Sequence, residues 1–285
     1  MQIPGRLTIC IADVPIAIES DARLPEWEIL PAYRPFISGG KGDVVLGLHS
    51  GISEMPIGQK VFDSSPIWTL HRYHHTSVIK IFDNFSGLKH MLVLPPDFKR
   101  ADLYFDEKYD HFMGPFLGPA MELMMINYLG QTNGTILHAC SVNRLGKGYL
   151  FAGESGAGKS TLSRLWYQEK GVEVLSDDRT IVRKQDGQFR MYGTPWHGEA
   201  PFGSPRGVRL ERIYFLGHGS KNAVRELNGA GAMLQFLKCS FPPYWDAPGM
   251  ESAMEIFEEL ATRVSCYELS FKPDDSAIDF LKGIR

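Results

Sequence analysis

Cysteine is scarce in this chain, and the cysteines that occur lie far apart. The 285 residues include four of them, and no two form a C-x-x-C pair. Neither a cysteine-based zinc site nor a disulfide framework is therefore expected. Because thiols generally stay reduced inside the cell, we expect a cytoplasmic protein. The four residues are Cys10, Cys140, Cys239 and Cys266.

Long apolar runs and an excess of positive charge are also lacking. No apolar run in the sequence approaches the roughly 20 residues that span a bilayer. The apolar stretch Leu7–Ile18 is interrupted by Asp13 and Pro15, so it lacks the basic leader and continuous apolar segment of a signal peptide. The formal net charge is −3. We therefore expect neither a membrane nor nucleic acid among the partners.

What the sequence does contain is a glycine-rich loop with a lysine and a hydroxyl. The stretch Phe151–Ser160 reads FAGESGAGKS and fits the pattern G-x-x-x-x-G-K-[ST]. Its glycines permit backbone conformations in which successive N–H groups converge on phosphate oxygens. Lys159 is then placed to reach the β- and γ-phosphates, and the Ser160 hydroxyl to ligate Mg²⁺.

The flanks of this loop have the pattern that a phosphate loop needs. Apolar Tyr149–Ala152 predicts a strand that enters the loop, and apolar residues at helical spacing in Thr161–Gln168 predict a helix that leaves it. The positive end of that helix faces the phosphates. The alternative is a glycine-rich turn with a chance lysine. We predict that ATP is bound by Gly153, Glu154, Ser155, Gly156, Ala157, Gly158, Lys159, Ser160 and Thr161.

Two apolar runs before the loop predict a β-hairpin. Ile136–Val142 and Gly148–Ala152 flank the turn segment Asn143–Lys147. The strand that feeds the loop thus has an antiparallel neighbour. His138 lies on that neighbour, where it either approaches the phosphates or has a structural role, and the residues alone favour neither.

An acidic pair follows the predicted loop helix. Val172–Leu175 predicts a strand that leads into Asp177 and Asp178, and Asp177 lies 18 residues after Lys159. One helix and one strand fill that interval, so both ends can meet at one edge of a sheet. Paired carboxylates there suit Mg²⁺ coordination and proton abstraction from an attacking hydroxyl. A solvent-exposed acidic turn is the alternative.

Three further segments invite a functional interpretation. Trp196–Glu199 offers Glu199 as another metal ligand, and the aromatic, proline-rich Phe241–Trp245 is either an active-site flap or an ordered connector. The histidines of His71–His75 have no second cluster with metal-ligand spacing, so we expect a solvated or hydrogen-bonded strand there.

Short alternating segments separated by turn formers predict a β-rich N-terminal half, and Pro115–Tyr128 predicts a helix at its end. We predict an α/β protein with two domains: a smaller β-rich domain in residues 1–130, for acceptor recognition or assembly, and a P-loop catalytic core with a mixed sheet in residues 131–285. The predicted N-terminal strands include Asp43–Leu48, Val78–Phe82, His90–Leu94 and Asp102–Phe105.

The combination of His138, the hairpin, GESGAGKS at Gly153–Ser160 and LSDD at Leu175–Asp178 resembles the catalytic domain of HPr serine kinase/phosphorylase. That family is a bacterial relative of ATP-dependent phosphoenolpyruvate carboxykinase. The resemblance covers about Thr135–Asp178 and weakens toward the C-terminus. It implies nucleotide binding by the loop and a core of HPr-kinase/phosphoenolpyruvate-carboxykinase type.

The resemblance also implies roles for single residues. Asp177 becomes the general base that takes the proton of the acceptor hydroxyl, and His138 and Asp178 support it with their charge. Catalytic members of the family form hexamers, so a homo-oligomer is an expectation. We predict as catalytic residues His138, Lys159, Asp177 and Asp178, and as metal ligands Ser160, Asp178 and Glu199.

The chain departs from the family at two places. Trp196–Glu199 differs from the family's Glu-Ile-Arg-Gly segment, and the basic, proline-containing loop used for HPr recognition is not found. The chain is therefore more similar to divergent HPr-kinase-like proteins, including those encoded with lasso-peptide pathways. We expect an ATP- and Mg²⁺-dependent kinase whose acceptor is a serine of a peptide or protein. The alternatives are a small-molecule hydroxyl kinase and a catalytically silent nucleotide sensor or scaffold.

Overall fold

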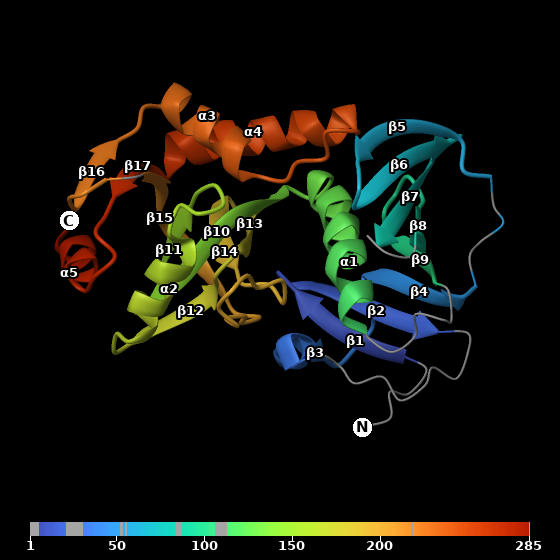
Figure 1. Ribbon diagram of the computed structural model, residues 1–285, viewed down its shortest axis with the longest axis horizontal. Helices are drawn as coiled ribbons and strands as arrows, with labels where there is room; N and C mark the ends of the chain where they lie inside the picture. The colour runs from blue at the N-terminus through green and yellow to red at the C-terminus, as the bar shows by residue number, and fades with distance from the viewer. Residues whose placement is uncertain are drawn as a thin grey trace. The chain divides into compact units, whose positions relative to one another are not determined.

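The computed structural model describes residues 6–20, 31–51, 54, 56–83, 87–105, 113–217 and 219–284 (Figure 1). Contacts divide the chain into two units. The first unit is Met1–Tyr128 with Tyr244–Ala247, and the second is Leu129–Pro243 with Pro248–Arg285. The sequence predicted a division at residue 130 and no return of the chain to the first unit.

In the first unit, nine strands of the described residues form one mixed sheet in the order β3-β1-β2-β4-β9-β8-β7-β6-β5. The pairs β2–β4 and β4–β9 are parallel, and the other neighbours are antiparallel. The strands are β1 Arg6–Ile11, β2 Val14–Ser20, β3 Ile37–Ser38, β4 Val44–Ser50, β5 Gln59–Ser64, β6 Trp68–Tyr73, β7 Thr76–Asp83, β8 Gly87–Leu94 and β9 Arg100–Phe105.

Sequence patterning located much of this sheet. The four predicted strands match β4, β7, β8 and β9, and the helix predicted from Pro115 is α1, Met113–Gly130. The hairpin of β5 and β6 was missed, because most residues of β5 are exposed and its apolar alternation is therefore weak. Within the segment predicted as a solvated strand, His71 lies in β6 and His74 lies in the β6–β7 turn with a φ of 50°. A short 3-10 helix, η1, covers Pro31–Phe36.

An aromatic cluster in the first unit includes a residue from the second half of the chain. The Trp245 ring meets Phe62 and Trp68 edge-on, at centroid distances of 5.3 and 5.2 Å. Its Nε1–H donates to Asn127 Oδ1 on α1 over 2.9 Å. Its carbonyl accepts from Arg72 Nη2 over 3.5 Å. The Trp245 ring therefore packs against aromatic neighbours, while its Nε1–H and its carbonyl oxygen both form hydrogen bonds.

In the second unit, eight strands of the described residues form another mixed sheet. The path runs β11-β10-β13-β14-β15-β17-β16, β12 pairs with β10, and β11 also pairs with β15. Because β11 touches both β10 and β15, the first five strands of the path close into a ring. The strands are β10 Gly134–Arg144, β11 Lys147–Ala152, β12 Val172–Ser176, β13 Arg179–Gln185, β14 Gln188–Tyr192, β15 Gly207–Gly217, β16 Ala223–Glu226 and β17 Ser265–Ser270.

The predicted hairpin before the loop is confirmed, and a second hairpin follows in the same unit. Strands β10 and β11 pair antiparallel across the predicted turn, and β13 and β14 pair around Asp186 and Gly187, both with positive φ. The strand β11, which feeds the loop, runs parallel to β15, and β15 runs parallel to β17. The sheet is therefore mixed, as predicted, and the whole chain is an α/β fold.

Helices cover both faces of this second sheet. Leu150 on β11 packs in a core with α3 (Gly229–Cys239) and α4 (Ala247–Arg263). The next residue, Phe151, packs in a different core with α2 (Lys159–Tyr167) and α5 (Ser276–Gly283). Successive side chains of a strand point to opposite faces. The loop after β11 therefore begins at a strand that is packed by helices on both faces.

The helices described in the structure include none that is both long enough and apolar enough to cross a membrane.

Candidate active site

A tight loop, residues 153–158, joins β11 to α2. Gly156 and Gly158 have φ values of 82° and 97°, which lie in the left-handed region that glycine adopts without strain. A Cβ at Gly158 would lie only 2.8 Å from the Phe271 ring. Gly158 is also the N-cap of α2 and provides no side-chain cap. The first N–H groups of the helix are thus available to an anionic ligand.

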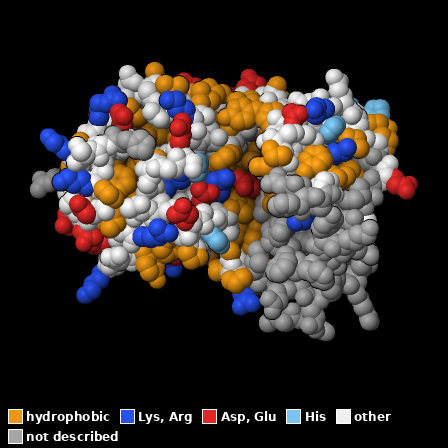
Figure 2. All heavy atoms as spheres, in the orientation of Figure 1, with side chains coloured by type: hydrophobic (Ala, Val, Ile, Leu, Met, Phe, Trp, Pro, Cys, Tyr) orange, Lys and Arg blue, Asp and Glu red, His pale blue; other side chains and the backbone are white. Residues whose placement is uncertain are grey.

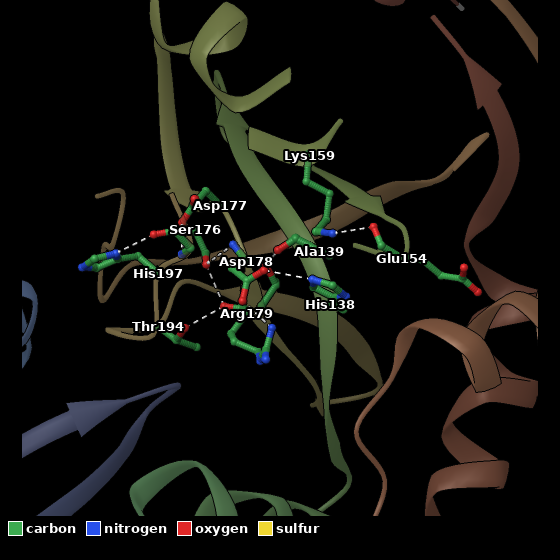
Figure 3. Close-up of polar contacts among 12 residues, drawn as sticks. His138, Ala139, Glu154, Lys159, Ser176, Asp177, Asp178, Arg179, Thr194 and His197 are labelled. Carbon is green, nitrogen blue, oxygen red and sulfur yellow. Dashed lines mark hydrogen bonds and ion pairs between the residues drawn. The ribbon is translucent and has the colours of Figure 1, made fainter. Parts of the chain in front are cut away.

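Lys159 begins α2, and its side chain is held against the loop. Its Nζ donates to the carbonyl oxygens of Gly153 and Glu154, each over 2.9 Å (Figure 3). The residue is 6% exposed. Burial lowers the pKa of the ammonium group, and the charge of Asp178 opposes that shift. Because an ammonium group has three N–H donors, one remains for a ligand beyond the two loop carbonyls.

Asp178 lies in the same cavity wall as Lys159, two residues after the end of β12. Its Oδ1 is 2.9 Å from His138 Nε2, and its Oδ2 accepts from Arg179 Nη1. Its own carbonyl oxygen accepts from the backbone N–H of Ala139 over 3.0 Å. Burial acts to raise the pKa of the carboxyl group, but the hydrogen bond from His138 and the charges of Arg179 and Lys159 outweigh it, so the pKa is lowered. Asp178 is therefore held as a carboxylate.

Asp177 has a different environment. It is fully buried, and its two carboxylate oxygens accept the backbone N–H groups of Gly198 and Ala200 over 2.9 and 2.8 Å. Burial raises its pKa, and the two backbone hydrogen bonds oppose that rise. Asp177 thus anchors the segment that carries Glu199, and its oxygens face the protein backbone.

A polar cavity of about 250 Å³ brings the phosphate loop and the acidic pair together. Of the residues predicted for nucleotide binding, Gly153, Glu154 and Ala157 lie outside its wall, although the first two hold Lys159. Asp177 also lies outside the wall. The cavity is lined by His138, Ser155, Gly156, Gly158, Lys159, Ser160, Thr161, Asp178, Gly198 and Glu199.

Glu199, the third predicted metal ligand, lies at the exposed rim of this cavity. Its side chain is 81% exposed, and Oε2 is 3.8 Å from Arg164 Nη2. Within the described ranges, no group of three or more His, Cys, Asp or Glu side chains is arranged to hold a metal ion. The donor set of Ser160 and Asp178 nevertheless fits Mg²⁺, because proteins bind that ion with one or two carboxylates together with substrate phosphates.

Two residues, Arg179 and Phe241, contribute to the site without having been predicted as site residues. Arg179 contacts Asp178, and the ring of Phe241 lies under its guanidinium group, with 4.3 Å between Cζ and the ring centroid. Arg179 follows the acidic pair directly, so its position was a usable signal. Phe241 belongs to the aromatic, proline-rich segment, but nothing in that segment indicated its target.

Comparisons with known proteins leave the family open. No protein-family model matches the chain, and no curated protein matches it either. The function is therefore inferred from the geometry of this cavity.

Proposed function

We propose that the protein is an ATP- and Mg²⁺-dependent kinase that transfers the γ-phosphoryl group to a hydroxyl. One observation carries this proposal: Lys159, Ser160 and Asp178 line the same cavity, with His138 beside them. A volume of about 250 Å³ is smaller than the roughly 300–1,000 Å³ of most sites for whole organic ligands. It suits a polyphosphate whose nucleoside extends beyond the cavity.

Lys159 and the loop would stabilise charge on the transferred group. The loop backbone and the start of α2 present N–H groups to phosphate oxygens, and Lys159 Nζ adds a full positive charge at the same wall. Ser160 and Asp178 would hold Mg²⁺, which supplies further neutralisation of phosphate charge when it is bound. Phosphoryl transfer depends mainly on such positioning and charge stabilisation, so no covalent nucleophile is needed.

Of the two aspartates, Asp178 is better placed to orient the acceptor hydroxyl. The family resemblance implies the role of base for Asp177, but Asp177 lies outside the cavity wall and its oxygens accept two backbone N–H groups. Asp178 lines the cavity and is held as a carboxylate by His138 and Arg179. A carboxylate of low pKa is a weak base. It can still orient the acceptor hydroxyl. Phosphoryl transfer passes through a loose transition state, so catalysis depends mainly on positioning the acceptor.

The acceptor we propose is a serine hydroxyl of a peptide or protein, because the sequence resembles HPr-kinase-like proteins that modify such hydroxyls. The cavity opens at Glu199, whose side chain is 81% exposed, so a chain-like acceptor can reach it from solvent. A small-molecule hydroxyl is the second candidate.

The experiment is transfer of labelled γ-phosphate from Mg-ATP to fractionated peptides and metabolites of the source cell. The wild type is compared with Asp178→Asn, which keeps the shape of the side chain, and with Asp186→Asn on the exposed turn of β13 and β14. Label on a fraction with the wild type and Asp186→Asn, but about 100-fold less with Asp178→Asn, is the expected result. Mass spectrometry then identifies the labelled hydroxyl.

Two results would contradict the proposal. Transfer by Asp178→Asn at the wild-type rate would show that the carboxylate of Asp178 takes no part in the reaction. Tight binding of ATP without label on any fraction favours a sensor or scaffold instead.

A further inference from the structure

Asp178 is restrained on both carboxylate oxygens, and only one of the two partners lies in the cavity wall. His138, the partner of Oδ1, lines the cavity. Arg179, the partner of Oδ2, is absent from the wall. In Figure 3 the Arg179 side chain extends from Asp178 on the side away from Lys159. Arg179 therefore supports the carboxylate from behind the cavity.

Arg179 is itself restrained. Its Cζ lies 4.3 Å from the centroid of the Phe241 ring, within the range of a cation–π interaction. Its carbonyl oxygen accepts from Ser176 Oγ and Thr194 Oγ1, each over 2.7 Å. Ser176 and Thr194 are fully buried. Both the backbone and the side chain of Arg179 are thus fixed by packed neighbours.

Phe241 is held by the sheet. Its backbone N–H donates to Ile136 O on β10 over 2.9 Å, and its ring centroid is 6.0 Å from that of His138. The aromatic ring therefore lies beside both partners of the Asp178 carboxylate. A planar guanidinium group matches this arrangement, because it stacks on an aromatic face and donates in its own plane at the same time.

We propose that Arg179, braced by Phe241, is a positioning residue that fixes the Asp178 carboxylate in the cavity wall. Arg179 acts through Asp178 and touches neither the nucleotide nor the acceptor. The consequence for phosphoryl transfer rests on the proposed function, whereas the restraint on Asp178 does not. The segment around Phe241 is then part of the support of the site rather than a flap over it.

The test uses the full chain and a matched pair of arginines. Arg179→Met removes the charge and keeps a long apolar side chain over Phe241. Arg190→Met is the control. Arg190 also lies near an aromatic ring of this unit, with 6.0 Å between its Cζ and the Tyr192 ring centroid. Its guanidinium group donates to the carbonyl oxygen of Gly207, which lies outside the cavity wall. Arg179→Lys restores the charge without the planar fork.

The first readout needs no activity. The ring nitrogens of His138 report its hydrogen bond to Asp178 through their NMR signals. If Arg179 orients the carboxylate, these signals change in Arg179→Met and stay at their wild-type positions in Arg190→Met. Unchanged His138 signals in Arg179→Met would overturn the proposal, even for a protein that binds no nucleotide.

The second readout is ADP formation from Mg-ATP in the presence of the acceptor fraction, or of water alone. We expect kcat to fall about 10- to 100-fold in Arg179→Met, as for other supporting partners of site ligands, with little change in KM for ATP. Arg179→Lys restores part of kcat. Phe241→Leu lowers kcat less, and adding it to Arg179→Met lowers kcat no further, because the two residues act as one unit.

The outcomes separate the two proposals. A wild type that neither binds nor turns over Mg-ATP contradicts the proposed function, and the His138 signals still decide the role of Arg179. Equal falls in kcat and in thermal stability for Arg179→Met and Arg190→Met would reduce Arg179 to a general structural residue.

Discussion

The two units bury ionisable groups in different ways. In the second unit, Lys159 and Asp177 are buried and Asp178 is partly exposed, and each has hydrogen-bond partners that match its charge. In the first unit the fully buried His90 sits in an apolar strand, and burial lowers its pKa to about 4. The second unit therefore keeps charged groups that have partners, whereas burial in the first unit disfavours the protonated form of His90. A buried charge is costly unless it is paired, and the charged groups of the second unit meet that condition.

Figure 2 shows one face of the molecule, on which acidic and basic side chains mix with apolar ones. The distinction between the two units lies in burial and pairing, and it can be tested residue by residue.

The largest effect is expected at Lys159. Lys159→Met removes the only buried lysine of the described cavity wall, so transfer from Mg-ATP should fall about 100- to 1,000-fold. Lys147→Met is the control, because Lys147 is an exposed lysine on the strand that feeds the loop. A rate for Lys159→Met close to that of Lys147→Met would show that the loop lysine takes no part in transfer.

The buried histidine gives the first unit its own signature. His90 has a folded pKa of about 4 against an ordinary value of 6.5. The unfolded chain therefore takes up a proton below pH 6.5 that the folded protein refuses until about pH 4. Stability is complete above the unfolded value and falls across this window by roughly 3 kcal/mol, at about 1.36 kcal/mol for each pKa unit.

Denaturant unfolding at pH 7.5 and pH 4.5 measures this effect in the wild type and in His90→Leu. The variant lacks the titration, so its free energy of unfolding should depend less on pH. If both proteins lose the same stability, His90 is not the group responsible.

Asp177 tests whether buried pairing in the second unit is structural as well as chemical. Asp177→Asn keeps one acceptor oxygen and leaves either Gly198 or Ala200 with an unpaired N–H. We expect a loss of about 1–3 kcal/mol in the free energy of unfolding. Hydrogen exchange at the two amides should accelerate, whereas unchanged exchange would mean that the segment does not depend on Asp177.

The smallest effect is expected where a charge pair is exposed. Arg225 and Glu268 pair across β16 and β17, with side chains 72% and 41% exposed. Arg225→Ala should change the free energy of unfolding by less than about 1 kcal/mol, and salt should reduce even that. A loss as large as that of Asp177→Asn would end the contrast between buried and exposed pairs.

The sequence located an element well where the spacing of apolar residues and the flanking turn-forming residues indicated the same structure. The β10–β11 hairpin was predictable because two apolar runs flank a turn segment. The ring of strands was not predictable, because the β11–β15 pairing joins residues about 60 positions apart that no local signal connects. The β5–β6 hairpin was missed because β5 is largely exposed.

The candidate site was predictable in its composition and less so in its division of roles. The glycines, Lys159, Ser160 and the acidic pair follow from spacing and residue type. Which aspartate faces the cavity depends on the segment around Gly198, whose backbone N–H groups occupy Asp177. Arg179 and Phe241 come together only in the folded chain, since 62 positions separate them.

The position of Trp245 has a practical consequence for dissecting the molecule. A fragment that stops after Tyr128 carries every strand of the first sheet but lacks the indole that packs on Phe62 and Trp68 and bonds to Asn127. Such a fragment exposes an aromatic surface and a buried amide to water, so it should aggregate or melt early. Folding of the first unit is then complete only after most of the chain has left the ribosome, which makes the N-terminal half dependent on residues synthesised long after it.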